Sequence, residues 1–578
     1  MSIFILNRDP SLKPAYKAVS KVLHANGFNK AKEIRSKEYS LLFLQKLIYA
    51  QEKKQPLANP FLQIDKNNFI AYCGSFFFDG LVGKPALKAC YRAFDGKGLD
   101  WQRCHGQFTL IINKNSELFI ATDNLGATKI YHNPEKTLFS NSFQVILDLI
   151  PHREIDVQGC YEFAFNGNTF GEKTFISQIR SVPYNQAVLL NKNCSFINKE
   201  NLLLWQQPTV KLSFEDCVDD QLTRLRALFK IYRNCFGDRI NTALSGGYDS
   251  RLILALFLDA NVTPSLFVYG ANGDPDVETA KNIAIGEGLP LDVVDKTSLV
   301  DMDPDSYAEH VEKNWAIFDG WKLSGLFDSG VDSSDRVKRS QDHLVVNGGA
   351  GEIYRNFFYL PNSPISIKQL IWAFFSRYDP KGCSKAFCAT SYMKNMENSF
   401  AKALGDGAEW NDRGRVEMAY PLLRGRYWTA RDAAINCRIG WTAFPFLEPS
   451  IIKDTWSIPF AYKEHGRLEA EMIKKLNPKL AAYNSVYGYN FSSLPGLFHR
   501  LSSLKSTRRP IWLRGYLYRA KYHRKKALPF YLEDNYLGQV IDLSFPHMKQ
   551  YFNMELINDP EVYNRVATME YTMGRQGF

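Results

Sequence analysis

The stretch Thr242–Arg251, with the sequence TALSGGYDSR, decides how this chain is interpreted. Residues 239–244 are predicted to form a buried strand, and the apolar residues 251–258 the start of a helix. Gly246 and Gly247 have no side chains, so backbone N–H groups at the turn can approach an anion closely. A strand, a glycine turn and a helix N-terminus favour negative charge through free N–H groups and the helix dipole. We therefore predict an anion-binding turn.

Three polar side chains of this turn complete the predicted site. Ser245 and Ser250 supply hydroxyl donors, and Asp249 supplies a carboxylate oxygen, the type of ligand that suits Mg²⁺. The pattern differs from the kinase-type phosphate loop, which requires Gly-x-x-x-x-Gly-Lys-Ser/Thr. It resembles instead the pyrophosphate loop of ATP pyrophosphatases, which split ATP between the α- and β-phosphates. The resemblance implies binding of ATP and Mg²⁺; the alternative is an ordinary glycine turn with a capping serine.

The composition is that of a globular protein, with 45% hydrophobic and 23% charged residues. A chain of 578 residues has room for two or more domains. No apolar run reaches the length of a membrane-spanning helix, the first residues do not resemble a signal peptide, and the ten cysteines form no Cys-x-x-Cys pair. We expect a cytoplasmic protein with reduced thiols and no zinc site.

Strands and helices alternate after the turn. Residues 265–270 and 291–294 are predicted strands, and a helix is predicted between them from about Asp276. This alternation indicates a parallel doubly wound sheet, which binds ligands at the carboxyl ends of its strands. The backbone of Val268 and Gly270 would then border the nucleotide and could bind adenine. A core strand without ligand contacts is the alternative.

A second glycine cluster, residues 344–355 with the sequence LVVNGGAGEIYR, follows another apolar strand. Together with the first turn it resembles the asparagine synthetase family, which includes glutamine-hydrolysing asparagine synthetase, β-lactam synthetase and lasso-peptide cyclases. The resemblance implies that Gly348 and Gly349 line the ATP site. In the family's second motif an Asp helps to bind Mg²⁺, and that position here is Gly351. Glu352, the next residue, is the predicted second metal carboxylate, beside Asp249 of the first turn.

Three cations are candidates for contact with a phosphate or a substrate. Arg355 is predicted to contact a phosphate or a substrate carboxylate, with a surface arginine as the alternative. Residues 466–478 resemble the family's helix that carries a lysine, which stabilises the pentavalent phosphorus during adenylation. No lysine stands at the matching place, so Lys463 and Arg467 are the candidate catalytic cations.

The first two hundred residues resemble the family's N-terminal glutaminase domain more weakly. Residues 69–76, 106–112 and 118–126 alternate in hydropathy and predict antiparallel hairpins. The resemblance implies an Ntn-hydrolase sandwich. Glutamine-hydrolysing members need Cys directly after the initiator Met, whereas this chain has Ser2, and the oxyanion-hole Asn is replaced by Cys73. We expect a sandwich without glutaminase activity; a serine variant is the alternative.

Residues 500–526 contain ten Lys and Arg residues and no acidic residue, interleaved with aromatic and aliphatic residues. Such a stretch can lie on an anionic membrane or hold a polyanion, and it can also be a solvated edge packed on its own domain. The net charge of +11 is modest for this length, and no nucleic-acid recognition motif is present, so nucleic acid is not expected as a partner. We predict a peripheral contact with the inner face of the membrane or with a lipid-linked substrate.

These observations predict a two-domain protein of mixed α/β and α+β class. An Ntn-like antiparallel sandwich is predicted over residues 1–205, an ATP-pyrophosphatase domain with a doubly wound parallel sheet over 206–499, and a basic extension over 500–578. The implied reaction is ATP-dependent amide formation, in which a carboxylate is adenylated, pyrophosphate is released, and the acyl group passes to an amine or ammonia. Glutamine-hydrolysing asparagine synthesis and a non-catalytic nucleotide-binding scaffold are the alternatives.

Overall fold

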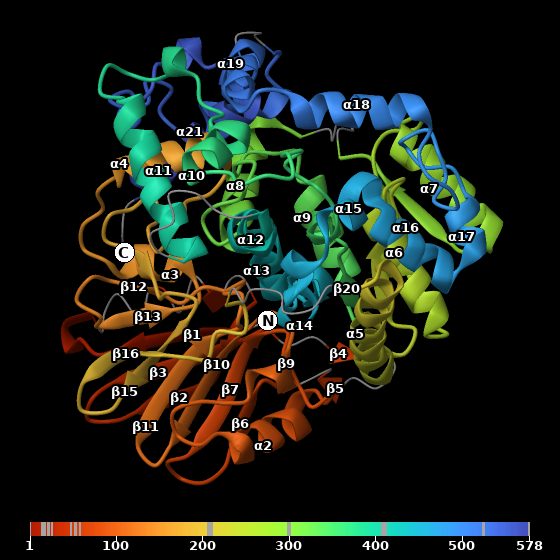
Figure 1. Ribbon diagram of the computed structural model, residues 1–578. Coiled ribbons are helices and arrows are strands. Elements are labelled where there is room, and N and C mark those ends of the chain that lie inside the picture. Colours follow the sequence, from red (N-terminus) through yellow and green to blue (C-terminus); the bar gives the residue numbers. More distant parts are fainter. Residues whose placement is uncertain are drawn as a thin grey trace.

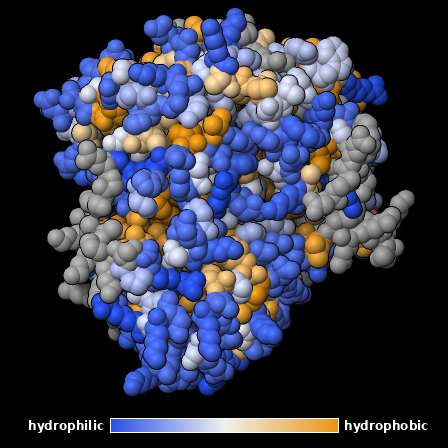
Figure 2. All heavy atoms as spheres, turned by 90° about the vertical axis from the view of Figure 1, so that its left-hand side faces the viewer, coloured by the Kyte–Doolittle hydropathy of each residue, from blue (hydrophilic) through white to orange (hydrophobic). Residues whose placement is uncertain are grey.

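The computed structural model describes residues 2–12, 19, 23–24, 27–46, 49–50, 55–56, 59–204, 212–296, 302–405, 413–522 and 526–575. Figure 1 shows strands of the N-terminal part in the lower half of the molecule and helices around a second sheet in the upper half. The face in Figure 2 is hydrophilic over most of its area, with separate apolar patches between. No helix within these ranges has the length and hydropathy needed to cross a membrane.

Two six-stranded sheets of antiparallel strands build the N-terminal part, and the predicted antiparallel hairpins are confirmed. Their orders are β14-β12-β13-β1-β3-β2 and β16-β15-β11-β10-β7-β6. Phe4 and Leu6 of β1 pack with Phe69 and Ile111 of the other sheet, because alternate side chains of a strand point to one face. The strands are β1 (Ser2–Asn7), β2 (Asn29–Arg35), β3 (Ser40–Gln45), β6 (Phe61–Gln63), β7 (Phe69–Gly74), β10 (Phe108–Lys114), β11 (Glu117–Thr122), β12 (Tyr131–His132), β13 (Leu138–Ser140), β14 (Arg180–Ser181), β15 (Gln186–Leu190) and β16 (Cys194–Asn198).

A five-stranded parallel sheet forms the centre of the upper half, as the alternation of strands and helices predicted. Its order is β19-β18-β17-β20-β21, so the chain winds outward from β17 in one direction and then in the other. The winding reverses between β17 and β20, and ligands of such sheets bind at the carboxyl ends of the strands beside that point. The strands are β17 (Ile240–Ala243), β18 (Ser265–Tyr269), β19 (Leu291–Val294), β20 (Leu344–Val346) and β21 (Trp441–Ala443).

Helices surround this sheet (Figure 1). The helix α5 begins at a capping box, in which Ser213 and Asp216 satisfy each other's backbone N–H groups. Residues 252–257 of the helix α6 are all buried, because that part of the helix is apolar on all sides. The helices are α2 (Gly83–Ala93), α3 (Phe143–Leu149), α4 (Val157–Asn166), α5 (Phe214–Phe236), α6 (Tyr248–Asp259), α7 (Pro275–Glu287), α8 (Tyr307–Ile317), α9 (Val331–Arg339), α10 (Ile367–Leu370), α11 (Ala389–Leu404), α12 (Arg413–Ala419), α13 (Ala430–Ile439), α14 (Pro449–Ile452), α15 (Phe460–Lys463), α16 (Arg467–Leu476), α17 (Pro478–Ala482), α18 (Leu497–Arg508), α19 (Ile511–Tyr522), α20 (Asp534–Leu537) and α21 (Pro560–Gly574), with π-helical turns η5 (Ile371–Phe375) and η7 (Tyr420–Thr429).

Buried polar contacts join the two halves. The carboxylate of Glu448 is 1% exposed and accepts hydrogen bonds from the Gly106 N–H at 2.7 Å and from the Gln107 side chain at 3.2 Å. The helix α21 packs against α4, and Arg565 donates to the carbonyl of Ala164. The chain after residue 526 thus contacts the N-terminal half, while the three domain boundaries stay a prediction.

Candidate active site

The two glycine-rich stretches meet at the carboxyl ends of β17 and β20. A β-carbon placed at Gly348 would lie 3.2 Å from the backbone carbon of Asp249, and one placed at Gly351 would lie 2.4 Å from its Oδ1. Real β-carbons do not approach other atoms so closely, so the carboxylate of Asp249 fills the space that a side chain at position 351 would need. This explains why position 351 is a glycine in this chain.

One arginine holds three carboxylates together at this point. Nη2 of Arg355 lies 2.6 and 2.8 Å from the two carboxylate oxygens of Asp249, and its Nε lies 3.0 Å from Oε2 of Glu469. The Glu352 carboxylate is 3.8 Å from Nη2. Burial raises the pKa of Asp249 to about 6, and raises that of Glu469 well above its usual value, in spite of the nearby guanidinium. In this structure Arg355 contacts these carboxylates, and its contact with a phosphate or a substrate carboxylate stays a prediction.

The predicted Mg²⁺ ligands do not fit a metal in this arrangement. Both oxygens of Asp249 accept hydrogen bonds from Arg355, and the phenol of Tyr420 donates to Glu352 at 2.5 Å. Across the described ranges, no group of three or more acidic, His or Cys side chains is placed to hold a metal ion. The pairing of Asp249 and Glu352 around Mg²⁺ is therefore not supported, because the guanidinium occupies the position of the cation.

Acceptors from the protein itself already satisfy the N–H groups predicted to bind phosphates. The Ser245 N–H donates to the Ser250 hydroxyl at 2.9 Å, and the Gly247 N–H donates to the Ser245 hydroxyl at 3.3 Å. The Gly246 N–H donates to Oδ1 of Asp276 at 2.8 Å. The Asp276 carboxylate therefore lies at the glycine turn and helix N-terminus, where a bound anion would lie. The turn is therefore formed as predicted and is closed by Asp276.

A segment after α17 covers the same turn. A β-carbon at Gly246 would lie 2.1 Å from Cγ1 of Val486, so this glycine allows the segment to approach. The ring of Tyr248 stacks on Phe491 with centroids 4.0 Å apart and on Tyr487 at 5.4 Å. These aromatic contacts hold the segment in place, and a phosphate reaches the amides only when it and Asp276 move. Sequence reasoning missed this cover because the contacts join residues far apart in the chain.

The other candidate residues have partners outside the turn. Lys463 is buried and donates to Glu417 at 2.8 Å, and Arg467 lies 5.0 Å from the ring of Phe214. Neither contact involves the turn, and a catalytic role for Lys463 or Arg467 stays a prediction. Val268 is buried in β18, and the N–H of Gly270 donates to the carbonyl of Val294 at 3.0 Å. That N–H is therefore not free for adenine.

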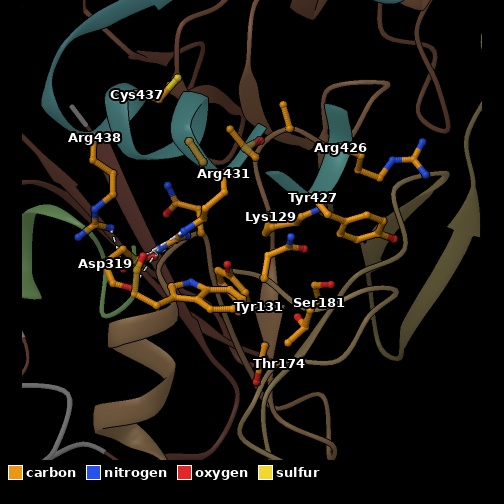
Figure 3. Close-up of a pocket in the computed structure, with 18 of the residues that line it drawn as sticks. Lys129, Tyr131, Thr174, Ser181, Asp319, Arg426, Tyr427, Arg431, Cys437 and Arg438 are labelled. Carbon is orange, nitrogen blue, oxygen red and sulfur yellow. Dashed lines mark hydrogen bonds and ion pairs between the residues drawn. The ribbon is translucent and has the colours of Figure 1, made fainter. Parts of the chain in front are cut away.

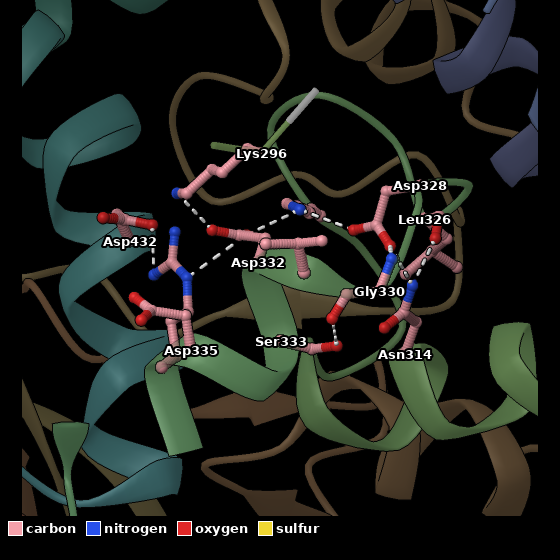
Figure 4. Close-up of polar contacts among 12 residues, drawn as sticks. Lys296, Asn314, Leu326, Asp328, Gly330, Asp332, Ser333, Asp335 and Asp432 are labelled. Carbon is pink, nitrogen blue, oxygen red and sulfur yellow. Dashed lines mark hydrogen bonds and ion pairs between the residues drawn. The ribbon is translucent and has the colours of Figure 1, made fainter. Parts of the chain in front are cut away.

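A cavity of about 580 Å³ lies beside the second glycine cluster. Asn347, Gly349 and Glu352 line one side of it. Figure 4 shows a network of charged side chains that also borders it, with dashed lines that converge on Asp332. Lys322 and Arg336 donate to that carboxylate from 2.7 and 3.2 Å. The cavity reaches the carboxyl end of β20 and presents many charges that neutralise one another.

One cation of this cavity has no such partner. The guanidinium of Arg424 lies 3.4 Å from the centroid of the Trp428 ring, and within the described part of the chain it makes no hydrogen bond or ion pair. Burial lowers the pKa of Arg424 to about 10, so it stays positive at neutral pH. Arg424 and Trp428 also border a second cavity of about 140 Å³, whose walls include Phe374 and Phe375. Asn166, Asn168, Arg377, Glu561 and Arg565 also line that second cavity, so Arg424 lies between two cavities that both have polar and apolar walls, with Glu352 as a nearby negative charge.

The remnant of the predicted glutaminase site borders a third, smaller cavity of about 50 Å³ (Figure 3). The Ser2 hydroxyl donates to the carbonyl of Tyr72 at 3.2 Å, and burial raises the pKa of the Cys73 thiol to about 12. Arg438 lies 3.1 Å from Asp319 across this cavity. The thiol is therefore protonated and the hydroxyl is engaged by the backbone, and the expected lack of glutaminase activity stays a prediction.

Comparisons with known proteins leave the family open. No family model matches the sequence, and no curated protein matches it. Among solved structures, glutamine phosphoribosylpyrophosphate amidotransferase from B. subtilis, complexed with ADP and GMP, is 9% identical; the match covers 51% of this chain and 65% of that one at a TM-score of 0.22. The U34-tRNA thiolase from Methanococcus maripaludis is 11% identical, with 55% and 83% covered at a TM-score of 0.19. Likenesses at such low scores carry no argument about function.

Substitution of the central arginine tests the ion cluster. We expect Arg355→Met to lower the free energy of unfolding by about 3–5 kcal/mol, because it leaves Glu469 and Asp249 without their cation in a buried position. Arg226→Met is the control, since Arg226 and Asp259 form an exposed pair worth about 0–1 kcal/mol. Urea denaturation of both variants measures the difference, and equal losses would show that the cluster does not stabilise the fold.

The N-terminal cavity predicts a second outcome. We expect the purified protein to release no glutamate from glutamine, and Ser2→Ala to leave every other activity unchanged, because no activated nucleophile is present. A coupled glutamate dehydrogenase assay measures this, with Cys73→Ala as the second variant. Glutamate release that disappears in Ser2→Ala would contradict it.

Proposed function

We propose that this protein is an ATP-dependent ligase that joins a carboxylate to an amine or ammonia with release of AMP and pyrophosphate. One observation carries the proposal: the Ser-Gly-Gly-x-Asp-Ser turn and the second glycine cluster, far apart in the chain, meet at the switch point of a parallel sheet beside a cavity of about 580 Å³. The two stretches are parts of one site because Gly348 of the second cluster lies against the backbone of Asp249 in the first.

The chemistry follows from those parts. A carboxylate oxygen of the substrate attacks the α-phosphorus of ATP, the bond to the β-phosphate breaks, and pyrophosphate leaves. The amine nitrogen then attacks the acyl carbon, the bond to the AMP oxygen breaks, and AMP and a proton leave. The N–H groups of Gly246 and Gly247 would hold the pyrophosphate once Asp276 releases the turn, and Arg355 would supply positive charge near it. Mg²⁺, implied by the resemblance, has no fitting ligand set here, and no step is assigned to it.

The cavity supports a substrate class within this proposal. Arg424 is the cation best placed to bind a carboxylate, since the other bases of the cavity have acidic partners. Its stacking on Trp428 holds the guanidinium plane in one orientation, which favours bidentate contact with a planar group. The cavity beyond it has Phe374 and Phe375 beside Asn168 and Arg377, so it suits a body that carries both an apolar portion and polar groups. The substrate proposed is therefore an acid whose body has both an apolar portion and hydrogen-bonding groups.

A non-catalytic nucleotide-binding scaffold is the second candidate. The observation that favours it is the closed turn, in which Asp276 and the hydroxyls occupy all three amides and Arg355 occupies Asp249. A scaffold would bind a nucleotide without turnover. Exchange of labelled pyrophosphate into ATP separates the two functions.

Exchange of labelled pyrophosphate into ATP tests the ligase. With a panel of acids that carry aromatic or aliphatic portions, we expect exchange that depends on the acid and that falls at least about 100-fold in Asp249→Ala, because the turn loses the anchor of Arg355 at the phosphates. Asp259→Ala, at the other end of the same helix α6, is the matched control and should keep the wild-type rate. If the protein binds nucleotide but no acid of the panel supports exchange, the ligase is contradicted and the non-catalytic scaffold is supported.

Arg424 gives an independent test of the substrate site. We expect Arg424→Gln to raise the KM for the acid about 10- to 100-fold with little change in the KM for ATP, as loss of one charge-assisted contact to a carboxylate predicts. Steady-state exchange kinetics with each substrate varied measures this, and Trp428→Phe should raise the same KM less. An unchanged KM for the acid would show that Arg424 does not contact its carboxylate.

A further inference from the structure

We propose that the helix α18 docks this protein on the surface of an anionic phospholipid membrane. Its exposed side chains are the unusual feature: Leu497 is 72% exposed, Phe498 92% and Leu501 60%. None of its residues is fully buried. Figure 1 shows α18 at the upper edge of the molecule, away from the two N-terminal sheets and close to α19. A large apolar surface on one exposed helix marks a site of interaction.

The orientation of α18 is the reverse of that expected for a helix packed on its own domain. The side chains that turn toward the protein are polar: His499 lies against Tyr489, with ring centroids 4.9 Å apart, and Ser503, Ser506 and Thr507 are half-buried. The apolar side chains at 497, 501 and 504 follow helical spacing on the opposite side, toward water. The leucines of α18 are hydrated in the folded protein, and transfer of that face from water to an apolar phase lowers the free energy.

The charges on and around this face select the partner. Arg500, Lys505, Arg508 and Arg509 are all exposed, and the sequence contains no Asp or Glu between Glu471 and Glu533. Aliphatic side chains with cations at their flanks match the interface of a bilayer, where the apolar groups enter the acyl boundary and the cations meet phosphate head groups. Lys and Arg can extend to the head groups while their stems stay in the apolar layer. An anionic bilayer fits both features at once.

The structure also corrects which cations take part. The basic stretch divides into α18 and α19, and Arg514 is buried, with donors to the carbonyls of Phe358 and Tyr359 at 2.8 and 2.6 Å. Arg514 therefore anchors α19 to the protein. Trp512 is exposed and belongs to α19, which Figure 1 shows near α18. Arg524 and Lys525 lie outside the described residues, and the proposal does not use them.

Co-sedimentation with vesicles tests the surface in the full-length protein. We expect binding to vesicles of phosphatidylcholine with phosphatidylglycerol, at least tenfold weaker binding to phosphatidylcholine alone, and loss of binding as salt is raised. The variant Phe498→Ser/Leu501→Ser removes the apolar face, and Arg500→Gln/Lys505→Gln/Arg508→Gln removes the charges. Each should lower binding at least tenfold. Because these side chains are exposed, neither variant should change the unfolding midpoint.

Matched controls exclude general effects of hydrophobicity and charge. Leu543→Ser/Leu556→Ser changes exposed leucines elsewhere, and Lys338→Gln/Lys394→Gln/Lys402→Gln changes exposed lysines elsewhere. Both should bind as the wild type does. Equal sedimentation of the wild type and the two α18 variants would overturn the proposal. Loss of vesicle binding in the charge variant alone would also overturn the proposal, because binding through charge alone is what a site for a soluble polyanion would show. Pyrophosphate exchange by the α18 variants should stay at the wild-type rate, so this outcome and the proposed function are tested separately.

Discussion

The ion cluster around Arg355 is the interaction on which the rest of the site depends. Its guanidinium joins the turn after β17, through Asp249, to the helix α16, through the fully buried Glu469. Charges in such a position are tolerable only when they are paired, since removal of water from a lone carboxylate is costly. The cluster therefore fixes how three elements of the upper half approach one another. In this cluster the guanidinium of Arg355 fills the space beside the Asp249 carboxylate.

This arrangement links electrostatics to access. Asp276 occupies one amide of the turn, and Val486 and Tyr487 cover it, so the anion-binding potential of the turn is directed inward. The proposed reaction then requires a competition, in which the phosphates of ATP replace the Asp276 carboxylate. Such a replacement exchanges one anion for a more highly charged one at a helix N-terminus, which the helix dipole favours.

The N-terminal sandwich has a structural part in this design. Glu448, directly after the turn that follows β21, is held by Gly106 and Gln107 of the sandwich. Since β21 borders β20 in the parallel sheet, the sandwich supports the same edge from which the cavity opens. This support does not depend on any chemistry at Ser2 or Cys73, because it consists of packing and hydrogen bonds.

The sequence by itself determined the elements and the meeting of the two glycine clusters. Local patterns suffice for this: a glycine turn between a strand and a helix, repeated after a second apolar strand, places both turns at one edge of a parallel sheet. Only the tertiary structure decided which charges meet there. Arg355 pairs with Asp249 and Glu469, Lys463 pairs with Glu417, and Arg424 forms no ion pair within the described residues, although the three bases look alike along the chain. Pairing depends on distances of a few ångströms between residues far apart in sequence, and no local pattern encodes such distances.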